Sequence, residues 1–355
     1  MKKLCQSACT GIFALSLVLS SIETVQSKTV TDVMGNVVEI PNKIERMAVA
    51  PMPWASVLWG LDGGSSRRLV SINPVSMAQY YECYLPHLDP AFSNISTSEI
   101  ASNFTVNVEE MMNLKPDVVF LWNNQEADAQ KLKAVGIASV MLRYATDLKM
   151  LCDNFAVVGA VLGREDLAQD MIDYHQKTES FFRDFSTKLD QSQRPRVLFM
   201  QGAQLKAAGA RNINQYLLQL TGAYNLAGVV DKQWVDLNME QVLAWDPEII
   251  YLSRFDDLTP QDLYEDKVPG QFWRNVSAVK NRRVYRTPAG IYSWHAPCLE
   301  TPLMLKWYAK IQHPEAVNYS FAQELKDFYR AYFNIALTDG DVKAIMHESL
   351  NGPIE

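Results

Sequence analysis

The feature that most constrains the fold is an internal repeat. Residues 107–122 read NVEEMMNLKPDVVFLW, and residues 238–253 read NMEQVLAWDPEIIYLS. Each copy predicts the same unit, because an asparagine that can cap a short helix is followed by a proline stop and then by an apolar run. Two copies of one helix–strand unit in a single chain indicate two lobes of similar construction.

Seven short apolar runs are the expected strands of these lobes. They fall at 46–50, 69–72, 117–122 and 138–142 in the first half, and at 196–201, 248–252 and 283–286 in the second. Continuous apolar runs are typical of strands that are buried on both faces of a parallel sheet. Since stretches with helical periodicity separate the runs, both halves are predicted to be α/β, with Rossmann-like lobes.

The segment between the halves has no strand pattern and little glycine or proline. Its apolar residues recur at three- and four-residue steps, most clearly over 167–189, and predict one long helix. We therefore expect an N-terminal α/β lobe over 28–146, a long rigid connecting helix over 147–190 and a C-terminal α/β lobe over 191–355.

Residues 1–27 are predicted to be a secretory signal peptide that is not part of the fold. Two lysines at 2–3 precede an apolar run at 11–19, and small side chains stand at the cleavage positions before residue 28. The apolar run is shorter than the roughly 18 residues that a transmembrane helix needs. We therefore expect a soluble chain in the periplasm.

Composition and motifs exclude several functions. The 355 residues include 33 Lys+Arg and 40 Asp+Glu, a formal net charge of -7, so we expect no nucleic-acid partner. Cys83, Cys152 and Cys298 are too far apart in sequence for a zinc motif, and their pairing stays open. No G-x-S-x-G, H-E-x-x-H, P-loop or dinucleotide-binding pattern is present, so we do not expect an enzyme.

Four segments are considered together because of their order and spacing. They are the segment TDVMGNVVEIP at 31–41, the first copy of the repeat, residues 208–227 and residues 302–314. They resemble the opening hairpin, the N-lobe signature, the C-lobe pattern and the final helix of periplasmic substrate-binding proteins of ABC importers, in the metal-chelate class. The resemblance implies a ligand cleft between two lobes with little hinge closure, and we expect a monomer.

The resemblance also implies that one glutamate on each lobe docks onto a permease dimer. Glu109 and Glu240 match these positions and occupy the same place in the two copies of the repeat. Their neighbours Glu110 and Gln241 have a local role, because a side chain three residues after the cap can complete a capping box. A carboxylate on each of two rigid lobes suits a partner with two symmetry-related basic pockets.

Candidate ligand-binding residues follow the predicted strands, because ligands of open α/β lobes bind at the carboxyl ends of strands. Aromatic faces suit flat ligands, and arginines suit carboxylate or catecholate groups. The candidates are Trp54, Tyr81, Trp122, Arg143, Arg211, Arg254, Tyr292, Trp294 and His295. Similarity to the family implies that Arg211 and Arg254 sit where catechol-siderophore binders place arginines. It also implies that the pair Tyr80 and Tyr81 sits where haem binders place an axial tyrosine, and that His295 is a candidate metal ligand.

The expected function is capture of an Fe(III)-siderophore or similar metal chelate and its delivery to an ABC transporter permease. The chelate is cargo, and no permanent cofactor is expected. Haem, cobalamin, molybdate or tungstate, and a nickel chelate stay open as cargoes, because the family uses one cleft for all of them. Two other classes stay open as well: a secreted α/β hydrolase that uses His295, and a metallochaperone that binds the bare ion.

Overall fold

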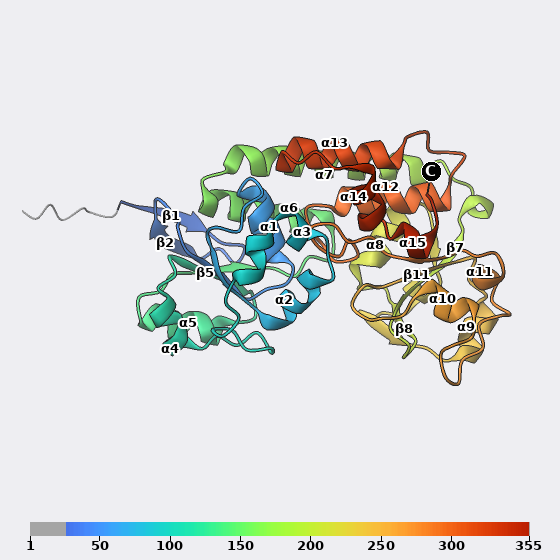
Figure 1. Cartoon of the computed structure of the whole chain (residues 1–355), viewed down its shortest axis with the longest axis horizontal. Coiled ribbons are helices and arrows are strands. Elements are labelled where there is room, and N and C mark those ends of the chain that lie inside the picture. The colour runs from blue at the N-terminus through green and yellow to red at the C-terminus, as the bar shows by residue number, and fades with distance from the viewer. Residues whose placement is uncertain (1–25, 355) are drawn as a thin grey trace, which may run out of the picture.

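The computed structural model describes residues 26–354, which form two α/β lobes joined by long helices (Figure 1). The N-terminal lobe contains a parallel sheet in the order β4–β3–β5–β6, preceded by an antiparallel hairpin of β1 and β2. The strands are β1 Ser27–Thr31, β2 Val37–Pro41, β3 Met47–Val49, β4 Leu69–Ile72, β5 Val118–Trp122 and β6 Ser139–Leu142. The helices are α1 Trp54–Leu61, α2 Pro74–Tyr81, α3 Leu85–Leu88, α4 Val108–Leu114 and α5 Glu126–Ala134, with a 3₁₀ turn at Pro90–Asn94.

The C-terminal lobe contains a second sheet in the order β10–β8–β7–β11–β12, with β9 beside β7. Its strands are β7 Arg196–Gln201, β8 Lys206–Ala208, β9 Tyr224–Asn225, β10 Trp234–Asp236, β11 Ile249–Leu252 and β12 Val284–Arg286. Its helices are α8 Ile213–Leu220, α9 Met239–Trp245, α10 Pro260–Tyr264, α11 Ser277–Lys280, α12 Thr301–Gln312, α13 Phe321–Phe333, α14 Asp339–Ile345 and α15 Glu348–Asn351, with 3₁₀ turns at Gln191–Gln193 and Leu226–Val229.

The central strands are buried on both faces, which explains their continuous apolar sequences. In β5, Val118 and Phe120 pack into one cluster, whereas Val119 and Leu121 pack into another on the opposite face. Strand β7 divides its side chains between two clusters in the same way. All seven predicted runs contain a strand, and the predicted α/β class with two separate sheets is confirmed.

The connection between the lobes differs from the single helix expected over 147–190. It contains two helices, α6 Leu148–Leu162 and α7 Glu165–Thr187, which pack against each other. Gly163 ends α6 in the left-handed conformation (φ 66°, ψ 40°), which glycine adopts without steric penalty. Gly159 lets α7 approach closely, since an added Cβ would lie 2.5 Å from the Cβ of Ala168. The prediction of one uninterrupted helix over 147–190 is therefore wrong, whereas the long helix predicted most clearly over 167–189 is confirmed by α7.

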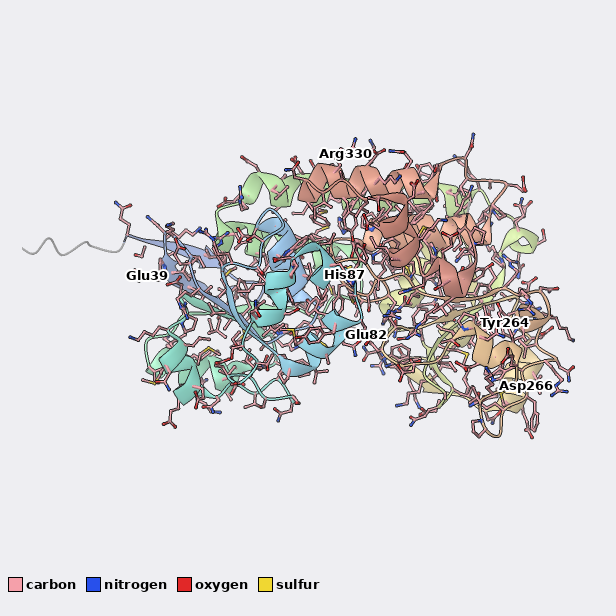
Figure 2. The ribbon with its side chains drawn as sticks, in the orientation of Figure 1. Glu39, Glu82, His87, Tyr264, Asp266 and Arg330 are labelled. Atoms are coloured by element: carbon pink, nitrogen blue, oxygen red, sulfur yellow. The ribbon has the colours of Figure 1, made fainter. Side chains whose placement is uncertain are left out.

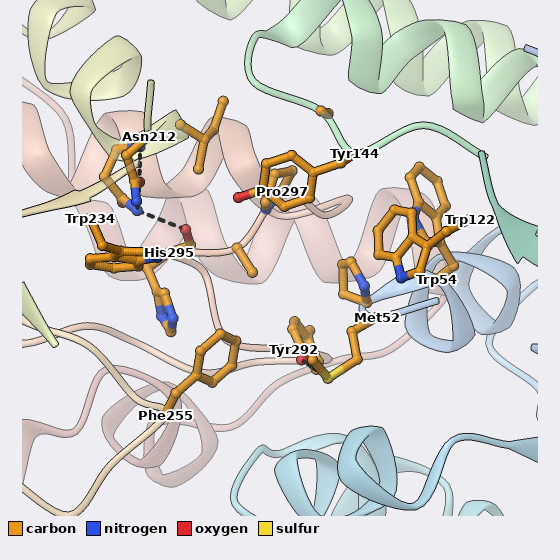
Figure 3. Close-up of a pocket in the computed structure, with 15 residues that line it drawn as sticks. Met52, Trp54, Trp122, Tyr144, Asn212, Trp234, Phe255, Tyr292, His295 and Pro297 are labelled. Atoms are coloured by element: carbon orange, nitrogen blue, oxygen red, sulfur yellow. Dashed lines mark hydrogen bonds between the residues drawn. The ribbon is translucent and has the colours of Figure 1, made fainter. Parts of the chain in front are cut away.

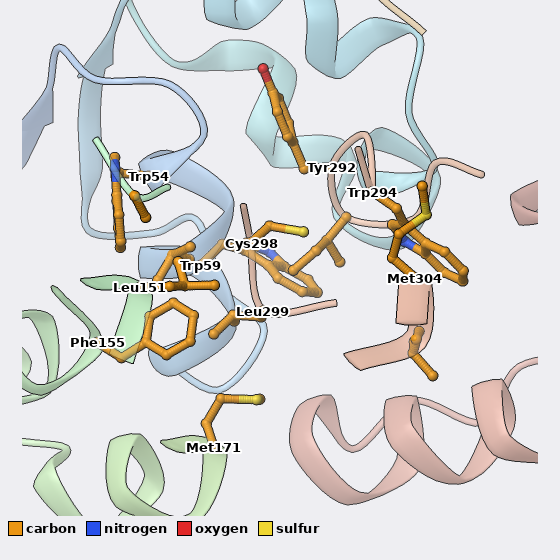
Figure 4. Packing of buried hydrophobic residues seen from close by; sticks show 14 of the residues in the cluster. Trp54, Trp59, Leu151, Phe155, Met171, Tyr292, Trp294, Cys298, Leu299 and Met304 are labelled. Carbon is orange, nitrogen blue, oxygen red and sulfur yellow. The ribbon is translucent and has the colours of Figure 1, made fainter. Parts of the chain in front are cut away.

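One hydrophobic cluster continues from lobe to lobe (Figure 4). It includes Trp59 of α1, Phe155 of α6 and Met171 of α7, which pack with Trp294 and Leu299 from the segment before α12. Helices α12 and α13 run back along α7 at the top of the view in Figure 1. Because the lobes share a packed core of large side chains, they are held together by far more than one connector, and wide hinge opening would expose that core.

The two copies of the repeat are built alike in three dimensions. Helices α4 and α9 both begin at a capping asparagine, and both end in a residue with positive φ. The guanidinium of Arg46 donates to the carbonyl of Leu114 at the end of α4, with its Nε at 3.0 Å. In the other lobe, Arg196 Nη1 donates to the carbonyl of Trp245 at the end of α9, also at 3.0 Å. Each helix is thereby fixed to the start of a central strand in the main sheet of its own lobe, β3 or β7.

Candidate functional site

A cavity of about 650 Å³, counted with the solvent at its mouth, lies between the lobes (Figure 3). Both lobes contribute residues to its wall, and most of them are aromatic or otherwise apolar. The wall consists of Met52, Pro53, Trp54, Trp122, Tyr144, Ala145, Asn212, Ile213, Asn214, Trp234, Phe255, Tyr292, His295, Ala296 and Pro297. Among residues 26–354, no Asp, Glu, Lys or Arg side chain lines this cavity.

The N-terminal lobe presents its aromatic residues at the carboxyl ends of its strands. Trp122 is the last residue of β5, and Trp54 begins α1 shortly after β3. Trp54 is only 1% exposed and is held edge-on against Phe155, with the ring centroids 6.1 Å apart. Its indole nitrogen has no hydrogen-bond partner within the described part of the chain. A buried orphan donor in a cavity wall is available to an acceptor atom of a ligand.

A polar bridge links the lobes at the edge of the cavity. Gln233 Nε2 of the C-terminal lobe donates to the hydroxyl of Tyr144 at 2.9 Å. The Tyr144 ring also lies 6.1 Å from the Trp122 ring, measured between centroids. Burial raises the pKa of Tyr144, so the phenol stays neutral and serves as the acceptor of this bond.

Two carboxamides under the cavity floor hold the loop that carries His295. Asn212 caps α8 by accepting from the backbone NH of Asn214 at 3.0 Å. Asn214 Nδ2 in turn donates to the backbone carbonyl of His295 at 3.0 Å (Figure 3). The Tyr308 hydroxyl donates to Asn214 Oδ1 at 3.2 Å. Their polar atoms are largely occupied inside the protein, so the floor is preorganised before any ligand arrives.

His295 is a neutral side chain. Burial, with a smaller contribution from the charge of Arg254, lowers its pKa to about 3. Its ring nitrogens face two hydroxyls, with Nε2 3.3 Å from Ser253 Oγ and Nδ1 3.4 Å from Thr287 Oγ1. The Phe255 ring packs edge-on against it at 4.3 Å. Both nitrogens are therefore already engaged, which disfavours direct metal ligation.

The pair of Ser253 and His295 bears on the hydrolase alternative, because sequence alone showed no nucleophile near the histidine. A serine nucleophile needs a histidine that can accept its proton and a third group that stabilises the imidazolium. Here Nδ1 faces the hydroxyl of Thr287 instead of a carboxylate, and the low pKa opposes protonation. The arrangement resembles a hydrogen-bonded core histidine more than a catalytic dyad.

Four of the nine predicted ligand-binding residues come together in the cavity wall. They are Trp54, Trp122, Tyr292 and His295. Two predicted aromatic residues lie elsewhere, contrary to expectation. Tyr81 is 55% exposed on α2, outside the cavity wall, and Trp294 lies in the shared core against Phe321, with ring centroids 5.9 Å apart.

The three predicted arginines do not line the cavity either, because local acceptors hold each of them. Arg143 Nη2 donates to the carbonyl of Val33 at 2.9 Å. Arg211 is exposed and pairs with Asp231 at 3.3 Å.

Arg254 is buried at the boundary of the lobes, where it donates to the carbonyl of Glu82 and lies 3.8 Å from the Glu82 carboxylate (Figure 2 shows Glu82 at this boundary). The cationic groups expected in the cleft are thus absent from its wall.

The predicted ligand-binding set lacks four aromatic or thioether residues of the wall: Met52, Tyr144, Trp234 and Phe255. Met52 and Tyr144 stand shortly after predicted strands but were not selected. Tyr144 and Phe255 each follow directly after a predicted arginine at a strand end. The prediction therefore chose the correct loops, but in each loop the residue after the predicted arginine lines the cavity. Trp234 lies in β10, a three-residue strand that no periodicity revealed.

Cysteine and metal chemistry are limited in the described residues. Cys83, Cys152 and Cys298 are buried free thiols, which answers the question of their pairing. No group of three or more His, Cys, Asp or Glu residues within 26–354 is arranged to hold a metal ion. No described helix is long and apolar enough to cross a membrane.

Comparisons with known proteins decide the family. The profile described as "Periplasmic binding protein" matches residues 61–290. A periplasmic solute-binding protein from Veillonella parvula is 38% identical, with a TM-score of 0.88 over 92% of this chain and 98% of that one. The chain belongs to the periplasmic binding protein family.

More distant relatives of this periplasmic binding protein are also named for what they bind. Molybdate-binding protein MolA of Haemophilus influenzae is 22% identical over 88% of this chain and 93% of its own length, and its molybdate-bound structure superposes with a TM-score of 0.74. A vitamin B12-binding protein of Yersinia pseudotuberculosis is 24% identical over 58% of this chain and 78% of its length. These relatives are described as binding proteins, so the family match favours binding over hydrolysis.

Family membership implies that this periplasmic binding protein works in the periplasm and carries a solute. The predicted signal peptide falls almost entirely outside the described residues, since 1–25 are not among them. The described chain begins just before the β1–β2 hairpin, where the family resemblance also begins.

Proposed function

We propose that this protein captures a metal chelate with little net charge and delivers it to an ABC transporter permease. One observation carries the proposal: the interlobe cavity has aromatic walls from both lobes and no Asp, Glu, Lys or Arg among its lining residues from 26–354. Burying a charged cargo in such a wall, without opposite charges, carries a large desolvation penalty. A chelate that presents apolar organic surface avoids that penalty.

The charge argument distinguishes between classes of ferric siderophore. Three hydroxamate groups neutralise Fe(III), whereas three catecholate groups leave a strongly negative complex. The arginines that would have suited catecholate are held by Val33, Asp231 and Glu82 outside the cavity wall. A ferric hydroxamate is therefore the favoured iron chelate, and the indole NH of Trp54 offers one donor to an oxygen at its surface.

Binding in this protein requires little rearrangement. The hydrogen bonds of Asn212 and Asn214 fix the cavity floor, and the shared core limits movement of the lobes. A preformed cavity reduces the conformational entropy lost on binding, so affinity depends mainly on contact with the aromatic walls. The chelate supplies the ligands of its own metal, and no protein side chain is required in the coordination sphere.

Delivery is proposed to occur through Glu109 and Glu240. Both side chains are exposed, one on α4 and the other on α9. In Figure 1 these two helices lie along the lower side of the molecule, one in each lobe, away from α7 and α13 at the top. Two carboxylates on one side of a monomer can meet two basic pockets of a permease dimer at the same time.

The cargo is tested by tryptophan fluorescence and native mass spectrometry. The panel contains a ferric hydroxamate, a ferric catecholate, haem, cobalamin, molybdate and nickel(II)–histidine. We expect the ferric hydroxamate to bind at least tenfold more tightly than the ferric catecholate. Trp122→Ala should weaken binding at least tenfold, whereas Phe272→Ala, at an exposed position outside the cavity, should not. Tight binding of molybdate or bare metal ion, with no organic chelate bound, would contradict the proposal.

The delivery step is tested by uptake of the bound chelate into cells. The double variant Glu109→Ala/Glu240→Ala should keep its affinity for cargo and lose uptake. Glu315→Ala, which removes an exposed carboxylate from another part of the surface, is the matched control and should support normal uptake. Loss of cargo affinity in the double variant would show that these two residues have another role.

A further inference from the structure

We propose that each docking surface has two parts, the carboxylate and an exposed apolar side chain three residues later. The apolar residues are Met112 on α4 and Leu243 on α9, which are 48% and 40% exposed. The inference rests on the proposed docking to a permease dimer, and it adds an apolar contact to the ionic one.

The repeat places the two apolar residues at equivalent positions. Over 107–114 and 238–245 the two copies show the same succession of buried, partly buried and exposed residues. In each copy the residue before the exposed one, Met111 or Val242, is fully buried and anchors the helix to its lobe. A single exposed apolar residue needs no explanation, but two at matched positions on separate lobes indicate a shared requirement.

The carboxylate and the apolar side chain share one face of each helix. Residues three apart in an α-helix lie next to each other on its surface, so Glu109 neighbours Met112 and Glu240 neighbours Leu243. The bonds from Arg46 and Arg196 to the ends of the helices fix the direction of both faces. Each lobe therefore presents one rigid patch that combines a negative charge with an apolar side chain.

The chemistry of these patches defines the partner. A complementary surface offers a basic side chain beside an apolar hollow, twice, on the two halves of one membrane-embedded dimer. Charges at the rim of an interface mainly accelerate association, and this effect weakens as salt is added. Apolar contacts at the centre of an interface mainly slow dissociation, because separation exposes them to water. The two parts of each patch are thus predicted to control different rate constants.

The experiment measures association and dissociation rates of the full receptor on nanodiscs that contain its cognate permease complex. The variants are Met112→Gln, Leu243→Gln and both together, because glutamine keeps a similar size and helix propensity. Phe181→Gln, at a position 55% exposed on α7, is the matched control. Cargo affinity is measured for every variant as a test of folding and of the proposed function.

We expect each single substitution to raise the dissociation rate about threefold to tenfold, and the double substitution about tenfold or more. Association should keep the salt dependence of the wild type, and Phe181→Gln should behave as the wild type. In contrast, Glu109→Ala/Glu240→Ala should remove most of the salt dependence.

The apolar part of the proposal would be overturned if the glutamine double variant dissociated at the wild-type rate while Glu109→Ala/Glu240→Ala bound the permease more weakly. That result would leave ionic docking intact. Wild-type rates for both double variants would instead overturn docking through these helices. Loss of cargo affinity in the glutamine variants would overturn the inference, because it would show that Met112 and Leu243 are needed for folding.

Discussion

Glu300 is a buried carboxyl group that titrates near neutral pH in the folded protein, so its ionisation links stability to pH. It is fully buried under the loop that carries Tyr292 and His295, and it accepts hydrogen bonds from the Tyr329 hydroxyl and from the backbone NH of Tyr292 at 3.2 Å. Burial, only partly offset by these bonds, raises the pKa of Glu300 from 4.5 to about 7. We expect Glu300→Gln to stabilise the protein at alkaline pH.

The sign follows from proton linkage. Between pH 4.5 and 7 the folded state holds a proton on Glu300 that the unfolded state has released, so raising the pH lowers the free energy of unfolding. The stability that depends on protonated Glu300 is fully present below pH 4.5 and is lost as the pH rises through 7. From the pKa difference, ionisation of Glu300 destabilises the fold by about 3 kcal/mol at pH 8 and by about 1 kcal/mol at pH 5.

Urea unfolding of the wild type and of Glu300→Gln at several pH values measures this contribution. The difference in unfolding free energy should grow by about 2 kcal/mol in favour of the variant between pH 5 and pH 8. Taking the difference cancels the buried histidines, whose titration both proteins share. Glu315→Gln controls for the loss of an exposed carboxylate. A difference that is constant with pH, or that shrinks as the pH rises, would refute the reasoning.

Two further predictions concern packing. Gly159→Ala should destabilise the protein by about 1–3 kcal/mol in urea unfolding, because the new methyl group would lie 2.5 Å from Ala168 and force α6 and α7 apart. The control Gly340→Ala, in an open position of α14, should leave stability unchanged or raise it by up to about 1 kcal/mol. Equal effects on stability at both sites would disprove the close approach of α6 and α7. The protein without residues 1–27, which contain Cys5 and Cys9, should react with less than about one equivalent of the thiol reagent DTNB, since burial raises the pKa of Cys83 and Cys152 to about 12. Rapid labelling of the folded protein would contradict the burial of these thiols.

The strands that could be predicted from the sequence are those that are covered on both faces of their sheet. A run such as VVFLW at Val118–Trp122 has no polar position because helices or loops cover both of its faces. Strands β8, β9 and β10 contain two or three residues each, and their sequences KAA, YN and WVD do not form continuous apolar runs. Gly163 was missed for a related reason, because a glycine within an apolar helical pattern is tolerated in many helices and ends this one through its positive φ.

The candidate site was predicted in place but only partly in chemistry. The carboxyl ends of parallel strands located the cavity, because that edge is fixed by topology. Which of two adjacent side chains faces the cavity depends on local bonding, which sequence does not show. Arg143 binds the carbonyl of Val33 while Tyr144 lines the cavity, and Arg254 binds Glu82 while Phe255 lines it. The resulting wall is aromatic where an arginine-rich one was expected.

The attachment of α4 and α9 to their sheets has a consequence for transport. Since Arg46 and Arg196 fix each helix to its own lobe, the spacing of the two proposed docking patches changes only when the lobes rotate relative to each other. If a transporter binds both patches, small differences between the loaded and empty receptor would change how well it fits. A change in the spacing of the transporter's own two sites would then strain the cavity and release the cargo, so recognition and release would depend on the same rotation of the lobes.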